Sequence, residues 1–200
     1  MIDALFFDIG NVLVTFDFTR CSRKLAEQSP LAPGDITAKI AALVPEMEWG
    51  RWSSGEFVRQ CVASTQFGGS EDEFIEAYSH IFEENTPMTA LVPRLAERCP
   101  LYLLSNTGGI HLDFLRRTYP VFRHFKGGAF SHESASMKPD AKIYRDVIAQ
   151  SGCDPARVLY LDDVPANTAA GAALGLQTFT YDWGQHAVFE DELKKRGILS

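Results

Sequence analysis

Short apolar runs that alternate with amphipathic stretches are the feature that most limits how this chain can fold. The runs occupy residues 4–7, 101–104, 128–130, 158–161 and 177–180. Stretches with apolar residues three and four positions apart, the spacing of a helix with one buried face, occupy residues 89–98, 109–118, 141–149 and 165–174. Strands that alternate with helices pair in parallel, so we expect an α/β fold with a parallel sheet flanked by helices.

The residues between the first and second runs break this alternation. The interval 16–84 contains helical patterns and no convincing strand. Prolines and glycines divide it into short helices, which we expect at residues 18–27, 35–43, 55–64 and 71–82. We therefore predict a core of residues 1–15 and 85–200 with a small helical cap, residues 16–84, inserted after the first strand. A cap in this place would exclude water from a site below it or select the leaving group.

Composition and charge narrow the classes of partner. Of the 200 residues, 46% are hydrophobic and 22% are charged, which is typical of a globular protein. The net charge of −7 argues against binding to nucleic acid, which needs a basic surface. No apolar run approaches the roughly 20 residues of a membrane span, and Asp3 stands where a signal peptide would carry Lys or Arg. We expect a cytoplasmic protein with reduced cysteines.

Polar side chains follow several of the apolar runs, and a parallel sheet brings such positions to one edge. Asp8 follows the first run and precedes a turn through Gly10 and Asn11, although an isolated aspartate here more often only starts a turn. Ser105 and Asn106 follow the second run, where hydroxyl, amide and backbone N–H groups suit either phosphoryl oxygens or the cap of the next helix. These residues are candidates for a site at the carboxyl end of the sheet.

Two further segments add a cation and two carboxylates. Lys138 precedes a predicted helix, where its charge would offset that of a phosphate, although a solvated surface lysine is the alternative. Asp162 and Asp163 end a buried run, and adjacent carboxylates repel unless a cation or basic group separates them; a helix-capping pair is the alternative. Because Mg²⁺ is held by one or two carboxylates with phosphate and water, Asp8 and Asp163 are its predicted ligands.

In this order and spacing, the four segments resemble the signature of the haloacid dehalogenase superfamily, over residues 2 to about 181. The resemblance implies a Rossmann-like core with a helical cap after the first strand, and Mg²⁺-dependent hydrolysis of a small phosphorylated metabolite. It implies that Asp8 is the nucleophile that forms an aspartyl-phosphate and that Lys138 is a second catalytic residue. The phosphate-binding residues that it implies are Ser105, Asn106, Lys138, Gly10 and Asn11. The metal ligands that it implies are Asp8, the Gly10 carbonyl, Asp163 and Asp162, the last directly or through water.

Gly10 departs from the pattern of most phosphatases of this superfamily, which carry an acid/base aspartate at that position. Such assistance is worth ~10² to 10⁴ in rate. The turn from Asp8 to Val12 and the Asp162-Asp163 pair with Asn167 look most like the bacterial sugar-phosphate phosphatase branch that includes glucose-1-phosphate phosphatases. Three explanations stay open: Asn11, Asp17, His111 or a cap residue positions water; the leaving group is good, as an anomeric oxygen is; or catalysis is slow. We favour the second.

The same departure leaves rival functions open. Dehalogenases of the superfamily also lack the second aspartate and need no metal, yet the bare pair Asp162-Asp163 would hinder attack by Asp8 unless a cation is bound. A phosphonate hydrolase would need a cap lysine, for which Lys24 and Lys39 are candidates. A catalytically weakened or non-catalytic protein with this fold is the remaining alternative. Phosphate chemistry with magnesium explains the carboxylate pair most directly.

An aromatic and polar cluster marks the predicted cap. Trp49, Arg51 and Trp52 lie within four residues of one another, in a segment we predict to be a loop. Their side chains suit stacking on a polar leaving group and hydrogen bonding to it. Packing inside the cap is the commoner role of tryptophan and stays open as the alternative.

Overall fold

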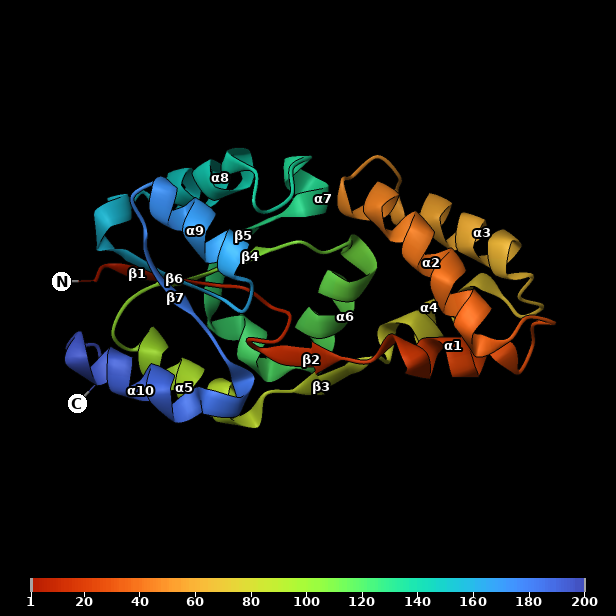
Figure 1. Ribbon diagram of the computed structural model, residues 1–200, viewed down its shortest axis with the longest axis horizontal. Coiled ribbons are helices and arrows are strands. Elements are labelled where there is room, and N and C mark those ends of the chain that lie inside the picture. Colours follow the sequence, from red (N-terminus) through yellow and green to blue (C-terminus); the bar gives the residue numbers. More distant parts are fainter. Residues whose placement is uncertain (1, 200) are drawn as a thin grey trace.

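The computed structural model describes residues 2–199, and its elements form two parts that lie side by side (Figure 1). The larger part contains a five-stranded parallel sheet with the strand order β5-β4-β1-β6-β7. These strands are β1 (Ala4–Phe7), β4 (Leu101–Ser105), β5 (Phe125–Phe130), β6 (Val158–Asp162) and β7 (Gln177–Thr180). The parallel α/β sheet predicted from the alternation is confirmed.

Helices cover both faces of this sheet, and the central strand shows why. Leu5 and Phe7 of β1 are buried against one group of helices, while Ala4 and Phe6 are buried against the other. The first group is α5 (Thr86–Ala96), α6 (Gly109–Thr118) and α10 (His186–Lys195), and the second is α8 (Ala141–Ser151) and α9 (Pro165–Ala173). A strand buried on both faces has no polar alternation, so β1 appears in the sequence as a continuous apolar run.

The smaller part consists of four helices, which we call the cap helices: α1 (Phe18–Ala26), α2 (Pro33–Glu48), α3 (Ser54–Thr65) and α4 (Glu71–Ser79). They enclose a hydrophobic core of their own around Phe57, Phe74 and Tyr78. Ser53 and Ser70 begin α3 and α4 with capping boxes that satisfy the free N–H groups of the first turn. None of the helices within residues 2–199 is long and apolar enough to cross a membrane.

Two short strands connect the parts, and here the sequence-based expectation was wrong. We expected no strand within residues 16–84, but β2 (Val14–Phe16) pairs antiparallel with β3 (Phe82–Glu84). Three residues are too few to show a period of two, and the predicted helix at 71–82 ends at Ser79. The four cap helices are joined to the sheet at β2 and β3 (Figure 1).

The remaining differences concern the ends of elements. Strand β5 begins at Phe125, three residues before the predicted run, because two glycines obscured it. An added Cβ at Gly128 would lie 2.5 Å from the carbonyl oxygen of Leu103, so glycine allows β5 to approach β4 closely. Helix α2 extends to Glu48, five residues beyond the predicted end at 43, and contains Pro45 inside it. Short helix α7 (Ser131–Ser134) and helix α10 were not anticipated.

Candidate active site

The sheet order places the ends of β4, β1 and β6 side by side, and the candidate residues gather there. Asp8 follows β1, while Ser105 and Asp162 are the last residues of β4 and β6. All of the predicted site residues except Asp162 line one cavity of about 210 Å³, which we call the strand-end cavity: Asp8, Gly10, Asn11, Ser105, Asn106, Lys138 and Asp163. The structure therefore brings together four segments that are far apart in the sequence.

Lys138 lies at the centre of this group. Its Nζ donates to Oδ1 of Asp8 at 2.8 Å, to Oδ2 of Asp162 at 2.6 Å and to the carbonyl oxygen of Leu104 at 3.0 Å. These three bonds use the three protons of the ammonium group. Burial would lower the pKa of Lys138, but the two carboxylates outweigh it and raise that pKa, so the lysine stays charged.

Asp8 is a buried carboxylate with one strong counter-charge. Its side chain accepts a hydrogen bond of 2.7 Å from the backbone N–H of Ile9, and only 8% of the residue is exposed. Burial raises the pKa of Asp8 to about 6, with Asp162 adding to the rise, whereas Lys138 and a hydrogen bond from Ser105 oppose it. A buried carboxylate with few water contacts, held at a fixed position, suits a nucleophile.

Asp162 is fully buried, and its oxygens are already occupied. Oδ1 accepts from the backbone N–H of Val164 at 2.8 Å and from the Asn167 side chain at 3.0 Å. Oδ2 accepts from Lys138 and from the Tyr160 hydroxyl. The sequence indicates that the adjacent carboxylates need a cation or a basic group beside them. Lys138, which also contacts Asp8, is that basic group for Asp162, whereas the partner of Asp163 is the neutral side chain of Asn11.

Asp163 faces the strand-end cavity and is half-buried. Its Oδ2 accepts a hydrogen bond of 2.9 Å from Asn11, whose backbone is left-handed with a φ of 52°. Carboxylate oxygens of Asp8, Asp162 and Asp163 all lie within 4.8 Å of one another. Three carboxylates and one ammonium group leave a formal charge of −2, and oxygen donors of this kind suit a hard divalent cation.

Asn106 holds Lys138 in place through the backbone. The side-chain oxygen of Asn106 accepts from the Lys138 N–H at 2.8 Å, and its amide donates to the Lys138 carbonyl at 3.0 Å. This pair uses one of the two N–H donors of the amide and one of the two lone pairs of its oxygen. Asn106 also lines the strand-end cavity, and phosphate binding by its second N–H stays a prediction. Ser105 beside it is buried and lines the cavity, where its hydroxyl also makes the hydrogen bond that opposes the rise in the pKa of Asp8.

Two residues considered as replacements for the missing aspartate have other roles in the structure. The Asp17 side chain accepts from the backbone N–H of Thr19 at 2.9 Å, so it is the exposed N-cap of α1. His111 is buried, and its Nε2 donates to the Tyr78 carbonyl at 3.0 Å. Burial lowers the pKa of His111 to about 4, so the imidazole is neutral at pH 7 and has no proton to spare there.

The candidate residues of the cap do not line the strand-end cavity. Arg51 pairs with Glu46 at 2.9 Å and lies 5.4 Å over the ring of Trp49, and Trp52 packs against the core of the cap helices. Lys24 pairs with Glu27 at 2.7 Å on the exposed side of α1. Lys39 is exposed on α2.

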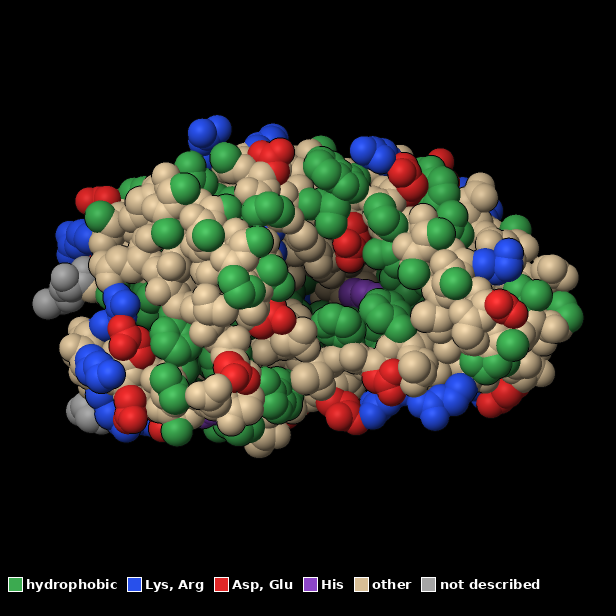
Figure 2. Space-filling view, in the orientation of Figure 1, with side chains coloured by type: hydrophobic (Ala, Val, Ile, Leu, Met, Phe, Trp, Pro, Cys, Tyr) green, Lys and Arg blue, Asp and Glu red, His purple; other side chains and the backbone are tan. Residues whose placement is uncertain are grey.

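One residue that the sequence did not reveal does face the site. Glu48 lines a second cavity of about 100 Å³ together with Gly10, Ser105 and His111, between the core and the cap helices. Figure 2 shows a hollow between the two parts in which acidic, histidine and hydrophobic side chains are visible. Because proline usually ends a helix, the sequence predicts an end at residue 43 and a loop at Glu48, whereas α2 continues through Pro45 to Glu48.

The fold and the site together define a class of protein: α/β enzymes with a buried aspartate, a lysine and further carboxylates at the carboxyl ends of a parallel sheet. More narrowly, the chain belongs to the haloacid dehalogenase-like hydrolases, whose family model matches residues 2–175. This confirms the family expected from the motifs. The narrower assignment to the branch with glucose-1-phosphate phosphatases stays a prediction.

Individual proteins resemble the chain over almost its whole length. A D-ribitol-5-phosphate phosphatase of Bacteroides thetaiotaomicron is 24% identical, over 92% of this chain and 96% of the relative. A solved haloacid dehalogenase family enzyme of the same organism, in complex with magnesium and inorganic phosphate, is 25% identical with a TM-score of 0.82, over 92% and 96% of the two chains. A structure described as a HAD-like family hydrolase from Porphyromonas gingivalis is 26% identical with a TM-score of 0.82, over 98% of each chain.

Proposed function

We propose that this protein is a magnesium-dependent phosphatase that hydrolyses a small phosphate monoester through an aspartyl-phosphate at Asp8. The observation that carries the proposal is the strand-end cavity, in which Asp8 lies 2.8 Å from Lys138 beside Ser105 and Asp163. A phosphoryl group placed there meets a nucleophile, a hydroxyl donor and a buried positive charge. These are the components that phosphoryl transfer requires.

Each residue has a separate task in this scheme. Asp8 attacks phosphorus, and the Ser105 hydroxyl donates to a phosphoryl oxygen. Lys138 offsets part of the negative charge, while Asp162 and Asn106 keep it in position.

The carboxylates fit a magnesium ion as well. Asp8 and Asp163 with the Gly10 carbonyl would hold it, because the Asp162 oxygens are engaged by Lys138, Tyr160, Val164 and Asn167. Magnesium, when bound, supplies the positive charge that lets an anionic phosphate approach an anionic carboxylate. The formal charge of −2 on the cluster supports a divalent cation.

Sugar and alditol phosphates are the substrate class we propose. The support comes from the relative named for D-ribitol 5-phosphate and from the enzyme solved with magnesium and inorganic phosphate. Ribitol 5-phosphate has a primary alcohol as its leaving group, which is a poor one. If this chain acts on a similar substrate, the good leaving group that we favoured from sequence does not explain Gly10, and another acid is needed.

Release of inorganic phosphate tests the proposal. Wild type should hydrolyse p-nitrophenyl phosphate and members of a sugar and alditol phosphate panel with Mg²⁺, and activity should disappear when EDTA removes the metal. Asp8→Asn should lose at least ~10³ of the rate, because the nucleophile is gone. Asp146→Asn is the matched control, since Asp146 pairs with Lys142 on the surface.

Two results would contradict the proposed function. One is equal activity of wild type and Asp8→Asn at every metal concentration. The other is halide release from 2-haloacids without metal, which would instead support a dehalogenase.

A further inference from the structure

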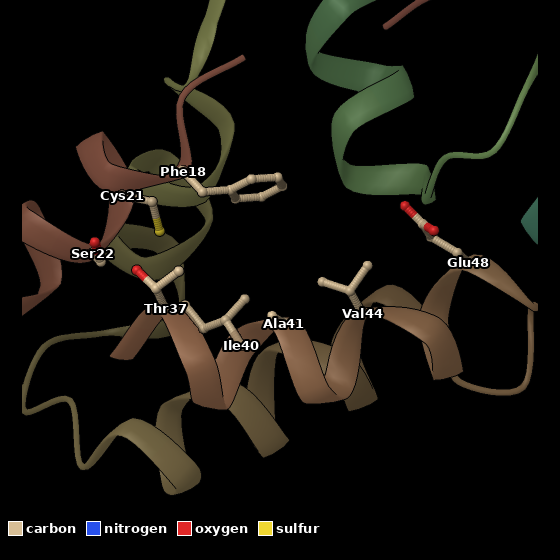
Figure 3. A pocket seen from close by; sticks show the side chains of 8 residues that line it. All are labelled: Phe18, Cys21, Ser22, Thr37, Ile40, Ala41, Val44 and Glu48. Atoms are coloured by element: carbon tan, nitrogen blue, oxygen red, sulfur yellow. The ribbon is translucent and has the colours of Figure 1, made fainter. Parts of the chain in front are cut away.

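Glu48 lies where the cap helices meet the catalytic residues. It is the last residue of α2, and its side chain borders two cavities. One is the cavity of about 100 Å³ that Gly10 and Ser105 also line. The other, of about 210 Å³, lies between α1 and α2 and is walled mainly by hydrophobic side chains; Figure 3 shows Glu48 at one end of it, beyond Ile40, Ala41 and Val44.

Close contacts with the core fix this end of α2. An added Cβ at Gly108, in the loop after β4, would lie 2.4 Å from Cε of Met47. An added Cβ at Gly50 would lie 2.3 Å from the carbonyl oxygen of His132 in α7. The Met47 side chain before Glu48 and the Gly50 backbone after it are therefore packed against core segments, which restricts where the Glu48 carboxyl group can lie.

The carboxyl group of Glu48 has no hydrogen-bond or ion-pair partner within residues 2–199. No side chain among residues 2–199 donates a hydrogen bond or forms an ion pair with it, and the residue is half-buried. Burial raises the pKa of Glu48 to about 7, and Asp8 adds to the rise while Lys138 opposes it. The group can therefore give up and take back a proton near neutral pH.

Apart from the charged groups of Asp8 and Lys138, the titratable groups within residues 2–199 that line a cavity with Glu48 or act on its charge are neutral at pH 7. They are Cys21 of α1, Tyr78 of α4 and His111 of α6. Burial raises the pKa of Cys21 to about 12 and that of Tyr78 well above its usual value, and it lowers that of His111 to about 4. Glu48 is thus the one group on the cap side of the cavity, within the described residues, that is suited to exchange a proton at neutral pH.

We propose that Glu48 is the general acid and base of this enzyme and performs from the cap the task for which the core, with Gly10, has no carboxylate. The inference rests on the proposed phosphatase function. In the first step a carboxylate oxygen of Asp8 forms a bond to phosphorus, the bond from phosphorus to the leaving oxygen breaks, and the Glu48 proton passes to that oxygen to give the alcohol.

In the second step the Glu48 carboxylate takes a proton from water. The water oxygen forms a bond to phosphorus, and the bond between phosphorus and Asp8 breaks. Inorganic phosphate leaves, Asp8 is again a carboxylate, and Glu48 is again protonated.

The dependence of rate on the leaving group tests this role. We compare wild type, Glu48→Gln, Glu48→Asp and Glu46→Gln on p-nitrophenyl, phenyl and alkyl phosphates. Glu46 is a matched control because it is on the same helix, with its carboxylate paired to Arg51. Glu48→Gln should lower kcat/KM by ~10² to 10⁴ for the alkyl phosphate and far less for p-nitrophenyl phosphate, which needs no proton on its leaving oxygen. Glu48→Asp should recover part of the loss, and Glu46→Gln should resemble wild type.

Transient kinetics and pH give two readouts that a purely structural role would not change. With p-nitrophenyl phosphate, Glu48→Gln should show a burst of p-nitrophenolate followed by slow turnover, because the second step lacks its base. In wild type, kcat/KM for the alkyl phosphate should fall as pH rises through about 7, since the carboxyl group loses the proton it must donate. That fall should be absent in Glu48→Gln.

The inference is overturned if Glu48→Gln keeps the wild-type dependence on leaving group, or loses rate equally on all three substrates without a burst. This differs from failure of the proposed function, in which Asp8→Asn would keep wild-type activity. An inactive Asp8→Asn beside an unaffected Glu48→Gln would remove only the present inference.

Discussion

The Lys138 ammonium group donates to three acceptors, and two of them are the carboxylates of Asp8 and Asp162. The roles open to these two acids therefore depend on Lys138. Asp162 has no solvent exposure and bonds Lys138 at 2.6 Å, so it orients the lysine rather than the substrate. Asp8 bonds the same group at 2.8 Å but also lines the strand-end cavity. Asp163 has Asn11 as its partner and is the acid most open to a cation.

His111 should make the stability of the fold sensitive to mild acid. Its folded pKa, about 4, is lower than the ordinary value of 6.5, so the unfolded chain binds the proton more readily. The stabilising contribution is complete above pH 6.5 and is lost as pH falls from there toward 4. Between pH 7 and pH 5 the loss is about 2 kcal/mol.

Urea unfolding of wild type and His111→Gln at both pH values measures this contribution. Buried Asp8 and Glu48 titrate in both proteins and cancel in the comparison. The free energy of unfolding should fall by about 2 kcal/mol more in wild type than in His111→Gln. Equal changes in the two proteins would show that His111 is not the source.

The site residues differ in how far the sequence reveals them. Asp8, Ser105 and Asp162 could be located because each follows a buried run. Lys138 could be located because it precedes a predicted helix, in a segment whose place among the other three resembles the family's order. The partners of Asp162 could not be inferred, since the Lys138 ammonium reaches it only through the tertiary fold. Glu48 has no motif around it, and the single signal pointing to it is the absence of an acid at Gly10.

At the scale of elements, the docking of α2 depends on Gly50. This residue has a φ of +69°, and an added Cβ would lie 2.3 Å from the His132 carbonyl oxygen. Gly50→Ala should therefore destabilise the protein by about 1 to 3 kcal/mol. It should also lower kcat/KM for alkyl phosphates, because Glu48 lies two residues away in the same docked segment.

Gly34→Ala is the matched control, on the first turn of the same helix. An added Cβ there meets nothing within 4 Å, so stability should be unchanged or increase by up to about 1 kcal/mol. Thermal unfolding and phosphatase assays of both variants check the expectation. If Gly50→Ala is as stable and as active as Gly34→Ala, the close contact between Gly50 and the His132 carbonyl oxygen does not fix the end of α2.

Long or fully buried helices and strands could be predicted from the sequence, whereas short or partly exposed ones could not. The strands of the central sheet were found because burial on both faces makes each one a continuous apolar run, as in β1 and β6. Strands β2 and β3 could not be predicted because each has only three residues, too few to show a period of two. The end of α2 was missed because Pro45 lies within the helix, whereas prolines more often end one.

At the scale of the whole molecule, the proposed site includes residues of both the core and the cap helices. The sheet edge provides Asp8, Ser105, Lys138 and Asp163, whereas Glu48 of the cap lines a cavity between the core and the cap helices. In the mechanism that we propose, the core binds the phosphoryl group and provides the nucleophile, whereas the cap exchanges the proton with the leaving group. Sequence alone could predict the first set from motifs but not the second.

Covalent trapping at Asp8 tests the central claim most directly. Enzyme with Mg²⁺ and substrate is quenched during a single turnover and reduced with borohydride, which converts an aspartyl-phosphate to homoserine, and peptides are analysed by mass spectrometry. We predict homoserine at position 8, dependent on substrate and more abundant in Glu48→Gln, where breakdown is slow. An unmodified Asp8 while phosphate is being formed, or modification at a different residue, would contradict the account.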